Sequence, residues 1–106
     1  MSDWIEVGTL DDFEDDDVFG AHVSGTPVAV YLVDGQVFAT HDICSHGHAR
    51  LSEGFVEDGL IECPLHQGLF DIRTGAPAGA PCTEPITVFE ARLEDRRILV
   101  SLTPVA

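Results

Sequence analysis

The chain has 106 residues, of which 44% are apolar, and both values are typical of one globular domain. Five arginines, no lysine and 19 acidic residues give a net charge of −14, which excludes the basic surface that nucleic-acid binding needs. No apolar run approaches the roughly 20 residues of a membrane span, and no signal peptide is visible. We therefore expect a single cytoplasmic domain over residues 1–106.

Alternating and β-branched apolar runs recur along the chain, and no segment keeps a helical apolar period for three turns. This pattern predicts an all-β fold. Asp34-Gly35 and Asp58-Gly59 each separate two such runs, and Asp-Gly favours a type I′ hairpin turn because glycine adopts positive φ without steric cost. The predicted hairpins have strands at 27–33 and 36–40, at 54–57 and 60–63, and at 86–94 and 98–102 around a turn at 95–97.

Three other segments carry local predictions. The stretch 11–17 has six acids in seven positions, too many for a core, and Thr9 can cap a single helical turn there. In the run 86–94 the apolar phase slips by one residue, which predicts a β-bulge or bend near Val88. The stretch 75–85 is predicted to be irregular because its prolines cannot donate hydrogen bonds to a strand ladder.

Two short clusters carry the candidate chemistry: Cys44-Ser-His46 and, after sixteen residues, Cys63-Pro-Leu-His66. Thiolate and imidazole are ligands of zinc or iron–sulfur sites rather than of calcium or magnesium. Structural zinc usually takes its cysteines from one segment and its histidines from another, whereas here each segment offers one of each. Such loops can each contact both metals of a binuclear centre, and a [2Fe–2S] centre in which two His replace two Cys is of the Rieske type.

Residues beside the two clusters also suit a metal centre. Gly47 and Gly68 let backbone N–H groups come close to a cluster, and Pro64 stiffens the second loop. The segments 44–49 and 63–71 together resemble those of Rieske ferredoxins, especially the small ferredoxin components of bacterial aromatic-ring-hydroxylating dioxygenase systems. The resemblance covers essentially the whole chain. It implies the Rieske fold, with stacked antiparallel sheets and an inserted cluster-binding subdomain at about residues 42–83.

The resemblance also implies a role for each candidate residue. Cys44 and Cys63 would hold the inner iron of one [2Fe–2S] cluster, and His46 and His66 would hold the outer iron near the surface. The residues implied to surround the cluster are Gly47, Pro64, Gln67, Gly68 and Pro81, the last in a loop that covers the cluster from a third side. The implied function is that of an electron carrier rather than an enzyme. It takes electrons from an NAD(P)H-dependent ferredoxin reductase and passes them to a terminal oxygenase, as a monomer in transient complexes.

The sequence departs from the high-potential Rieske proteins of cytochrome complexes. Those carry an additional disulfide between the loops, and the matching positions here are Ala49 and Leu65. They also carry a Ser and a Tyr that donate hydrogen bonds to cluster and ligand sulfurs, where this chain has Gly68 and Phe70. Such hydrogen bonds favour the more negative, reduced state, so their loss lowers the potential. We expect a potential at the low end of the Rieske range, roughly −150 mV.

Two other functions stay open at this point. One is a small Rieske subunit of another oxidoreductase, such as a nitrite reductase, and the other is a colourless zinc-binding structural module. The remaining candidates His22, His41, His48 and Cys82 are interpreted as structural or exposed residues rather than ligands. The charge of −14 either aids solubility alone or steers the protein to basic partner faces. The aromatic substrate leaves no trace on an electron donor and cannot be derived from this sequence.

Overall fold

The computed structural model describes residues 4–14, 16–43, 49–64, 68–79 and 84–104. These residues form ten strands and two short 3-10 helices, so the all-β prediction is confirmed. No helix among them is long and apolar enough to cross a membrane. In chain order the elements are β1 Trp4–Thr9, η1 Leu10–Phe13, β2 Val18–Val23, β3 Thr26–Val33, β4 Gln36–His41, η2 Leu51–Glu53, β5 Phe55–Glu57, β6 Leu60–Glu62, β7 Leu69–Asp71, β8 Pro77–Gly79, β9 Val88–Glu94 and β10 Arg97–Pro104.

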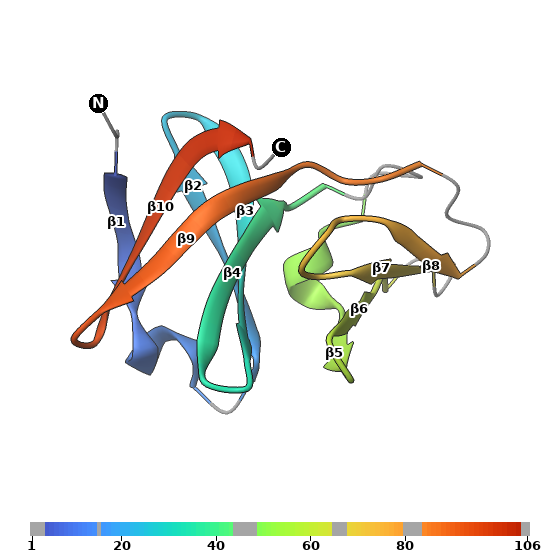
Figure 1. Cartoon of the computed structure of the whole chain (residues 1–106), viewed down its shortest axis with the longest axis horizontal. Coiled ribbons are helices and arrows are strands. Elements are labelled where there is room, and N and C mark those ends of the chain that lie inside the picture. Colours follow the sequence, from blue (N-terminus) through green and yellow to red (C-terminus); the bar gives the residue numbers. More distant parts are fainter. Residues whose placement is uncertain (1–3, 15, 44–48, 65–67, 80–83, 105–106) are drawn as a thin grey trace.

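The strands form two antiparallel sheets that lie side by side (Figure 1). The large sheet has the order β1-β10-β9-β4-β3-β2, and the small sheet has the order β5-β6-β7-β8. All of the small sheet lies in sequence between β4 and β9, yet these two strands pair with each other at Ala39↔Phe89 and Thr40↔Val88. The backbone N–H of His41 also donates to Thr87 O at 2.9 Å. The chain therefore leaves the large sheet and returns to it at the same point.

The two sheets share a core through β3, which is buried on both faces. Val28 and Val30 pack into the apolar cluster inside the large sheet. Ala29 and Tyr31, which alternate with them along the strand, pack into a second apolar cluster that includes Ile61 and other residues of the small sheet. Because side chains alternate between the faces of a strand, both faces need apolar residues, and this explains why the run 27–33 is continuously apolar.

Two predicted hairpin turns have the expected type I′ geometry. Both central residues have positive φ, at 52° and 78° in Asp34-Gly35 and at 55° and 77° in Asp58-Gly59. The third turn was predicted to be one residue too long, since Glu94 pairs with Arg97 and only Asp95-Arg96 lie between the strands. A fourth hairpin turn, Ser24-Gly25 between β2 and β3, also has two positive φ values and was not predicted.

The irregularity expected near Val88 is present, but its extra residues belong to the partner strand. Glu90 pairs with Ser101, and Phe89 pairs with Pro104, so β10 carries two additional residues at this place. Val88 and Phe89 are both buried, which is the phase slip that the sequence shows. β9 pairs with β10 on one side and with the end of β4 on the other.

The prediction that 75–85 is wholly irregular was wrong, because Pro77–Gly79 forms strand β8. Proline is tolerated here because β8 is an edge strand and Pro77 is its first residue, so no ladder hydrogen bond is lost. The prediction for the N-terminal turn is confirmed. Thr9 caps η1 in a capping box with Asp12, and the acidic residues described there are exposed, while Phe13 packs edge-to-face on Phe19 with ring centroids 4.9 Å apart.

A buried carboxylate, Asp42, joins the end of β4 to η2. It is 1% exposed, and its two oxygens accept from the backbone N–H of Ser52 at 2.8 Å and from the Ser52 hydroxyl at 2.9 Å. Arg50 adds an ion pair at 3.4 Å. Gly20 of β2 leaves the space for this arrangement, since a Cβ there would lie 2.8 Å from Ser52 Oγ. The sheet and the segment after it are therefore held together by satisfied buried hydrogen bonds.

Tyr31 and Thr40 form a buried hydrogen-bonded pair near Asp42. The Thr40 hydroxyl donates to His41 O at 3.0 Å, so the Tyr31 hydroxyl, 2.8 Å away, donates to Thr40. Burial raises the pKa of Tyr31 well above its ordinary value, and the charge of Asp42 acts in the same direction. Tyr31 thus stays neutral and packs as an apolar ring with one satisfied hydroxyl.

Replacing Asp42 by Ala should lower the free energy of unfolding by about 3 kcal/mol, because two donors of Ser52 lose their acceptor in a buried place. Urea denaturation of the purified protein measures this change. Glu90→Gln on the exposed face of β9 is the matched control and should change the free energy by less than about 0.5 kcal/mol. A loss below 1 kcal/mol for Asp42→Ala would show that the network does not hold the segment.

Candidate metal centre

The structure describes some of the predicted site residues and not others. Cys63, Pro64 and Gly68 lie in the described part of the chain. The predicted residues Cys44, His46, Gly47, Leu65, His66, Gln67 and Pro81 lie outside the described residues, as do His48 and Cys82. What the structure does place are the residues that flank these segments, and their hydrogen bonds show how each segment begins and ends.

Cys63 follows β6 directly and is 1% exposed. Its side chain belongs to the core cluster shared by the two sheets. Its backbone N–H donates to Gly68 O at 2.8 Å, so the segment 64–67 leaves the small sheet and returns to it at one hydrogen-bonded pair. Pro64, the next residue, is exposed. The chain therefore passes from the core to the surface within one residue, with the sulfur on the buried side.

The segment that carries Cys44 and His46 is also closed by described residues. Ile43 and Arg50 form an isolated antiparallel bridge, and Leu51 N–H donates to Asp42 O at 2.7 Å. The side-chain bonds of Asp42 to Ser52 reinforce this closure. Ala49, at one end of the segment, packs against the core cluster that contains Cys63. The end of the first Cys–His segment and the start of the second therefore lie beside the same core.

The third segment, which carries Pro81, starts next to the second. Gly79 of β8 pairs with Leu69, and Leu69 follows Gly68. After this segment, Ile86 N–H donates to Gly75 O at 2.9 Å and the Ile86 side chain enters the core cluster with Cys63. Gly75 has φ +78°, and a Cβ there would lie 2.3 Å from Ile86 O, so only glycine allows this close approach.

These residues fit a thiolate-held metal centre. A sulfur buried in an apolar cluster, at the base of a short closed loop, is shielded from solvent, and such shielding is one means by which proteins control a redox centre. Phe70 is fully buried in the same apolar core. Its phenyl ring has no hydroxyl group. An iron–sulfur cluster held here would supply one-electron redox chemistry. The chain supplies a buried sulfur, closed loop ends and a dry core beneath them.

The two histidines interpreted as structural are described, and both lie on strands of the large sheet. His22 on β2 is exposed, and His41 on β4 is half-buried with its Nδ1 3.4 Å from Ile43 O. Sequence reasoning missed Asp42, although a lone acid at the end of an apolar strand and two residues before Cys44 was a usable signal. Its burial shows that it serves the fold beneath the first Cys–His segment.

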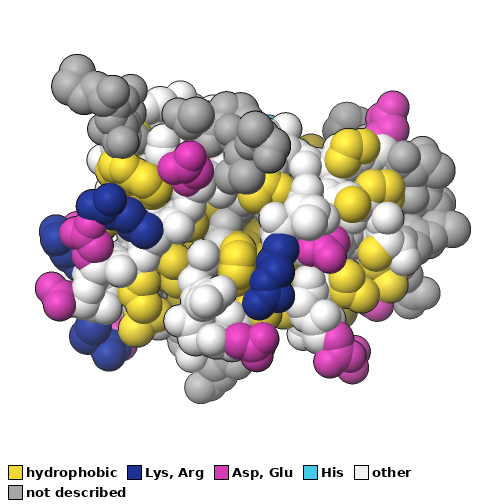
Figure 2. Space-filling view, in the orientation of Figure 1, with side chains coloured by type: hydrophobic (Ala, Val, Ile, Leu, Met, Phe, Trp, Pro, Cys, Tyr) yellow, Lys and Arg dark blue, Asp and Glu magenta, His cyan; other side chains and the backbone are white. Residues whose placement is uncertain are grey.

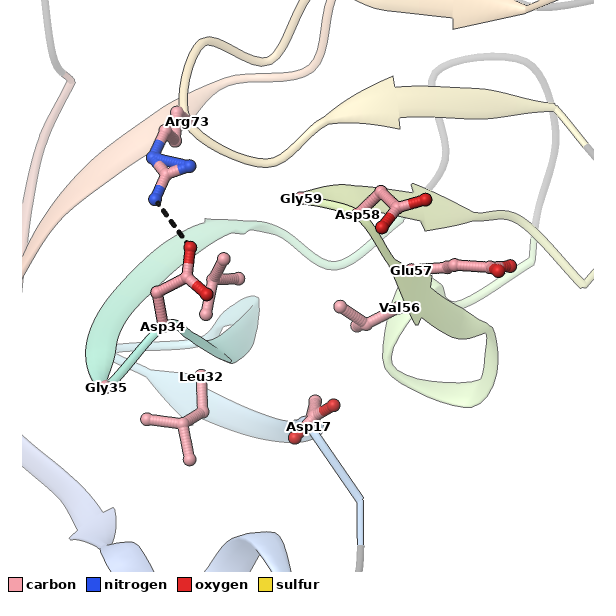
Figure 3. Close-up of a pocket in the computed structure, with 10 residues that line it drawn as sticks. Asp17, Leu32, Asp34, Gly35, Val56, Glu57, Asp58, Gly59 and Arg73 are labelled. Atoms are coloured by element: carbon pink, nitrogen blue, oxygen red, sulfur yellow. Dashed lines mark ion pairs between the residues drawn. The ribbon is translucent and has the colours of Figure 1, made fainter.

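A cleft elsewhere in the described part of the chain is a different feature. It has a volume of about 560 Å³ and lies between the β3–β4 turn and the β5–β6 turn (Figure 3). Arg73 crosses it, with Nη2 3.7 Å from Asp34 Oδ2 and the guanidinium 5.1 Å from the centre of the Phe38 ring. The β5–β6 turn is the end of these strands opposite to Cys63. The cleft therefore marks the contact between the sheets and not the metal centre.

Comparison with known proteins shows the family of this chain. The family model described as "Rieske [2Fe-2S] domain" matches residues 3–90. The anthranilate 1,2-dioxygenase ferredoxin subunit of Burkholderia cepacia is 50% identical over 102 residues, which cover 96% of this chain and 94% of that protein. The naphthalene 1,2-dioxygenase system ferredoxin component of Pseudomonas putida is 43% identical over 100 residues, covering 94% of this chain and 96% of that one.

A solved structure extends the likeness to three dimensions. A chain in the complex of reduced oxygenase and oxidized ferredoxin in carbazole 1,9a-dioxygenase has a TM-score of 0.89 and 37% identity, and the match covers 100% of this chain and 99% of that one. The described strands, the buried Cys63 and these matches agree. The chain therefore belongs to the Rieske [2Fe–2S] domain family, as a Rieske-type ferredoxin similar to the ferredoxin components of dioxygenase systems.

Proposed function

We propose that this ferredoxin carries single electrons from an NAD(P)H-dependent ferredoxin reductase to the terminal oxygenase of an aromatic-ring-hydroxylating dioxygenase system. The observation that carries the proposal is the buried Cys63 at the base of a loop closed by its bond to Gly68, in a chain half identical to a dioxygenase ferredoxin. The chain is an electron carrier and not itself an enzyme. It binds its partners transiently, as a cytoplasmic monomer, and the aromatic substrate stays with the oxygenase.

Within this proposal, one [2Fe–2S] cluster is held by four residues. Cys44 and Cys63 hold the inner iron, and His46 and His66 hold the outer iron. The burial of Cys63 and the exposure of Pro64 beside it support the assignment of the thiolates to the inner side. The residues proposed to surround the cluster are Gly47, Pro64, Gln67, Gly68 and Pro81. The cluster-binding subdomain then spans about residues 42–83 of a single domain over 1–106.

The competing function was a permanent small subunit of a nitrite reductase. Relatives that are 43 and 50% identical over nearly the whole chain are ferredoxin components of dioxygenase systems, which favours the dioxygenase role. A solved putative NADH-dependent nitrite reductase small subunit from Mycobacterium tuberculosis has a TM-score of 0.84 at 22% identity, with the match covering 99% of each chain. That likeness shows a shared fold and carries no functional assignment.

The low potential is part of the proposal. Phe70 packs in the same apolar core as Cys63, and its ring has no hydroxyl to donate to a sulfur. Gly68, whose carbonyl already accepts from Cys63, has no side chain at all. A reduced centre carries one more negative charge, so missing donors cost the reduced state more than the oxidised state. The potential therefore lies near the low end of the Rieske range, roughly −150 mV.

Replacing His66 by Ala should remove the native cluster, because the loops hold it only through their four ligands. The purified wild type should be red-brown and contain inorganic sulfide and two irons per chain, as a [2Fe–2S] cluster requires, with the EPR signal of a nitrogen-ligated centre. The variant should lose that signal. His22→Ala on the exposed side of β2 is the control and should keep it. An unchanged spectrum for His66→Ala would show the ligand assignment to be wrong.

Replacing Phe70 by Tyr should raise the reduction potential by about 60 mV. A charge-assisted hydrogen bond to a sulfur stabilises the reduced state by roughly 1.5 kcal/mol, and 59 mV corresponds to about 1.4 kcal/mol for one electron. Protein-film voltammetry measures the shift. Phe19→Tyr, whose ring packs in the core of the large sheet, should leave the potential unchanged. A wild-type potential clearly above zero at pH 7 would contradict the low-potential proposal.

A further inference from the structure

The side of the small sheet that faces away from the core carries several large apolar residues. On β5, β6 and β7 the middle residues Val56, Ile61 and Phe70 pack against the core, so their strand neighbours point outward. Three of those outward residues are Phe55, Leu60 and Leu69, which we call the outer face. Phe55 is 67% exposed and is the most exposed large apolar side chain among the described residues. An antiparallel sheet normally presents polar residues to water on its open side.

One row of residues on this side of the small sheet lies beside Cys63. Phe55 pairs with Glu62, Glu62 pairs with Leu69, and Leu69 pairs with Gly79, so these residues form one row across the sheet. Cys63 and Gly68 come directly after and before members of this row. A partner seated on Phe55 and Leu69 would therefore be adjacent to the strand ends that lead into the proposed cluster loops.

The outer face has an acidic rim. A shallow groove of about 170 Å³ is lined by Phe55, Glu57, Asp58, Leu60, Glu62 and Leu69. Within the described part of the chain, its three acids form no ion pair. An exposed apolar patch with a polar rim is a mark of a protein interaction site. The unpaired carboxylates fit a partner whose contact surface carries Lys and Arg around an apolar centre.

The arginines of the large sheet are paired with acids, unlike the unpaired acids of this rim. Arg92, Arg96 and Arg97 all lie on the β9–β10 hairpin of the large sheet, and each is paired with an acid, namely Glu94, Asp11 or Glu6. Figure 2 shows basic side chains over the large sheet and near the centre, and acidic side chains beside hydrophobic ones over the small sheet at the right. Two copies of the acidic rim would repel each other, which disfavours a homodimer through this face.

We propose that the outer face docks the terminal oxygenase, with Phe55 in an apolar depression of that partner and Glu57 and Glu62 against its basic residues. This rests on the proposed function and assigns it a surface. A relative of this fold and length has been solved with its oxygenase, so such a partner engages a ferredoxin of this shape. A small apolar centre with a charged rim suits a short-lived electron-transfer complex, which buries little area.

The test measures electron transfer from chemically reduced ferredoxin to a purified aromatic-ring terminal oxygenase that the wild-type protein reduces in single-turnover experiments. Phe55→Thr should raise the half-saturating ferredoxin concentration roughly 10- to 30-fold without changing the limiting rate, because an exposed aromatic anchor is lost. Phe55→Leu should restore most of the affinity. The double variant Glu57→Gln/Glu62→Gln should reduce the dependence of the second-order rate on salt.

Ile5→Thr on β1 is the matched control, because Ile5 is the other exposed large apolar residue, at 37%, and lies on the large sheet. It should leave the half-saturating concentration within twofold, and every variant should keep the wild-type cluster spectrum. A change below twofold for Phe55→Thr, or an equal change for Ile5→Thr, would overturn the proposal. So would a Phe55→Thr defect confined to reduction by the reductase. If the wild type with its native cluster reduces no terminal oxygenase, the proposed function itself fails.

Discussion

The pairing of β4 with β9 fixes where the metal-binding part of the chain begins and ends. Ala39↔Phe89 and the His41–Thr87 hydrogen bond bring together residues that are more than forty positions apart in sequence. Everything between them must leave and re-enter the large sheet at one place. The inserted segment can therefore carry its own short sheet and loops without disturbing the order of the large one, and described residues close the ends of these loops.

The shared core couples the insertion to the large sheet. β3 contributes Ala29 and Tyr31 to the cluster that contains Cys63, Phe70 and Ile86. The buried side chains of the small sheet, Ile61 and Phe70, cannot move without disturbing a strand buried on both faces, since cores are close-packed. Arg73 adds a second connection at the far end through Asp34 and Phe38, but these side chains are partly exposed and such pairs contribute little. The packing, more than the ion pair, positions Cys63.

Sequence reasoning succeeded where a local signal has a local cause. Asp34-Gly35 and Asp58-Gly59 specify their turns because each glycine takes positive φ, and Thr9 specifies its cap through its own hydroxyl. It failed at Pro77, because whether a proline lies in a strand depends on that strand being an edge, which is a property of the whole sheet. Asp42 was missed for the same reason, since its burial follows from Ser52 and Gly20 meeting it. The four candidate ligands were predicted from their residue types and spacing, and a resemblance assigned them to the inner and outer iron; of the four the structure describes Cys63 alone.

The acidic rim of the outer face and the missing hydroxyls both lower the potential of the proposed centre, but with unequal strength. Glu57, Asp58 and Glu62 lie near the surface, where water and salt screen charges over a Debye length of about 8 Å. Their effect on the energy of an added electron is therefore small, and it weakens further at high salt. Phe70 lies in a dry core, where a hydrogen bond is electrostatically stronger, so the absence of a donor at this position has a larger effect. The core thus sets how tightly the electron is held, while the surface acids are left to influence which partner arrives and how fast.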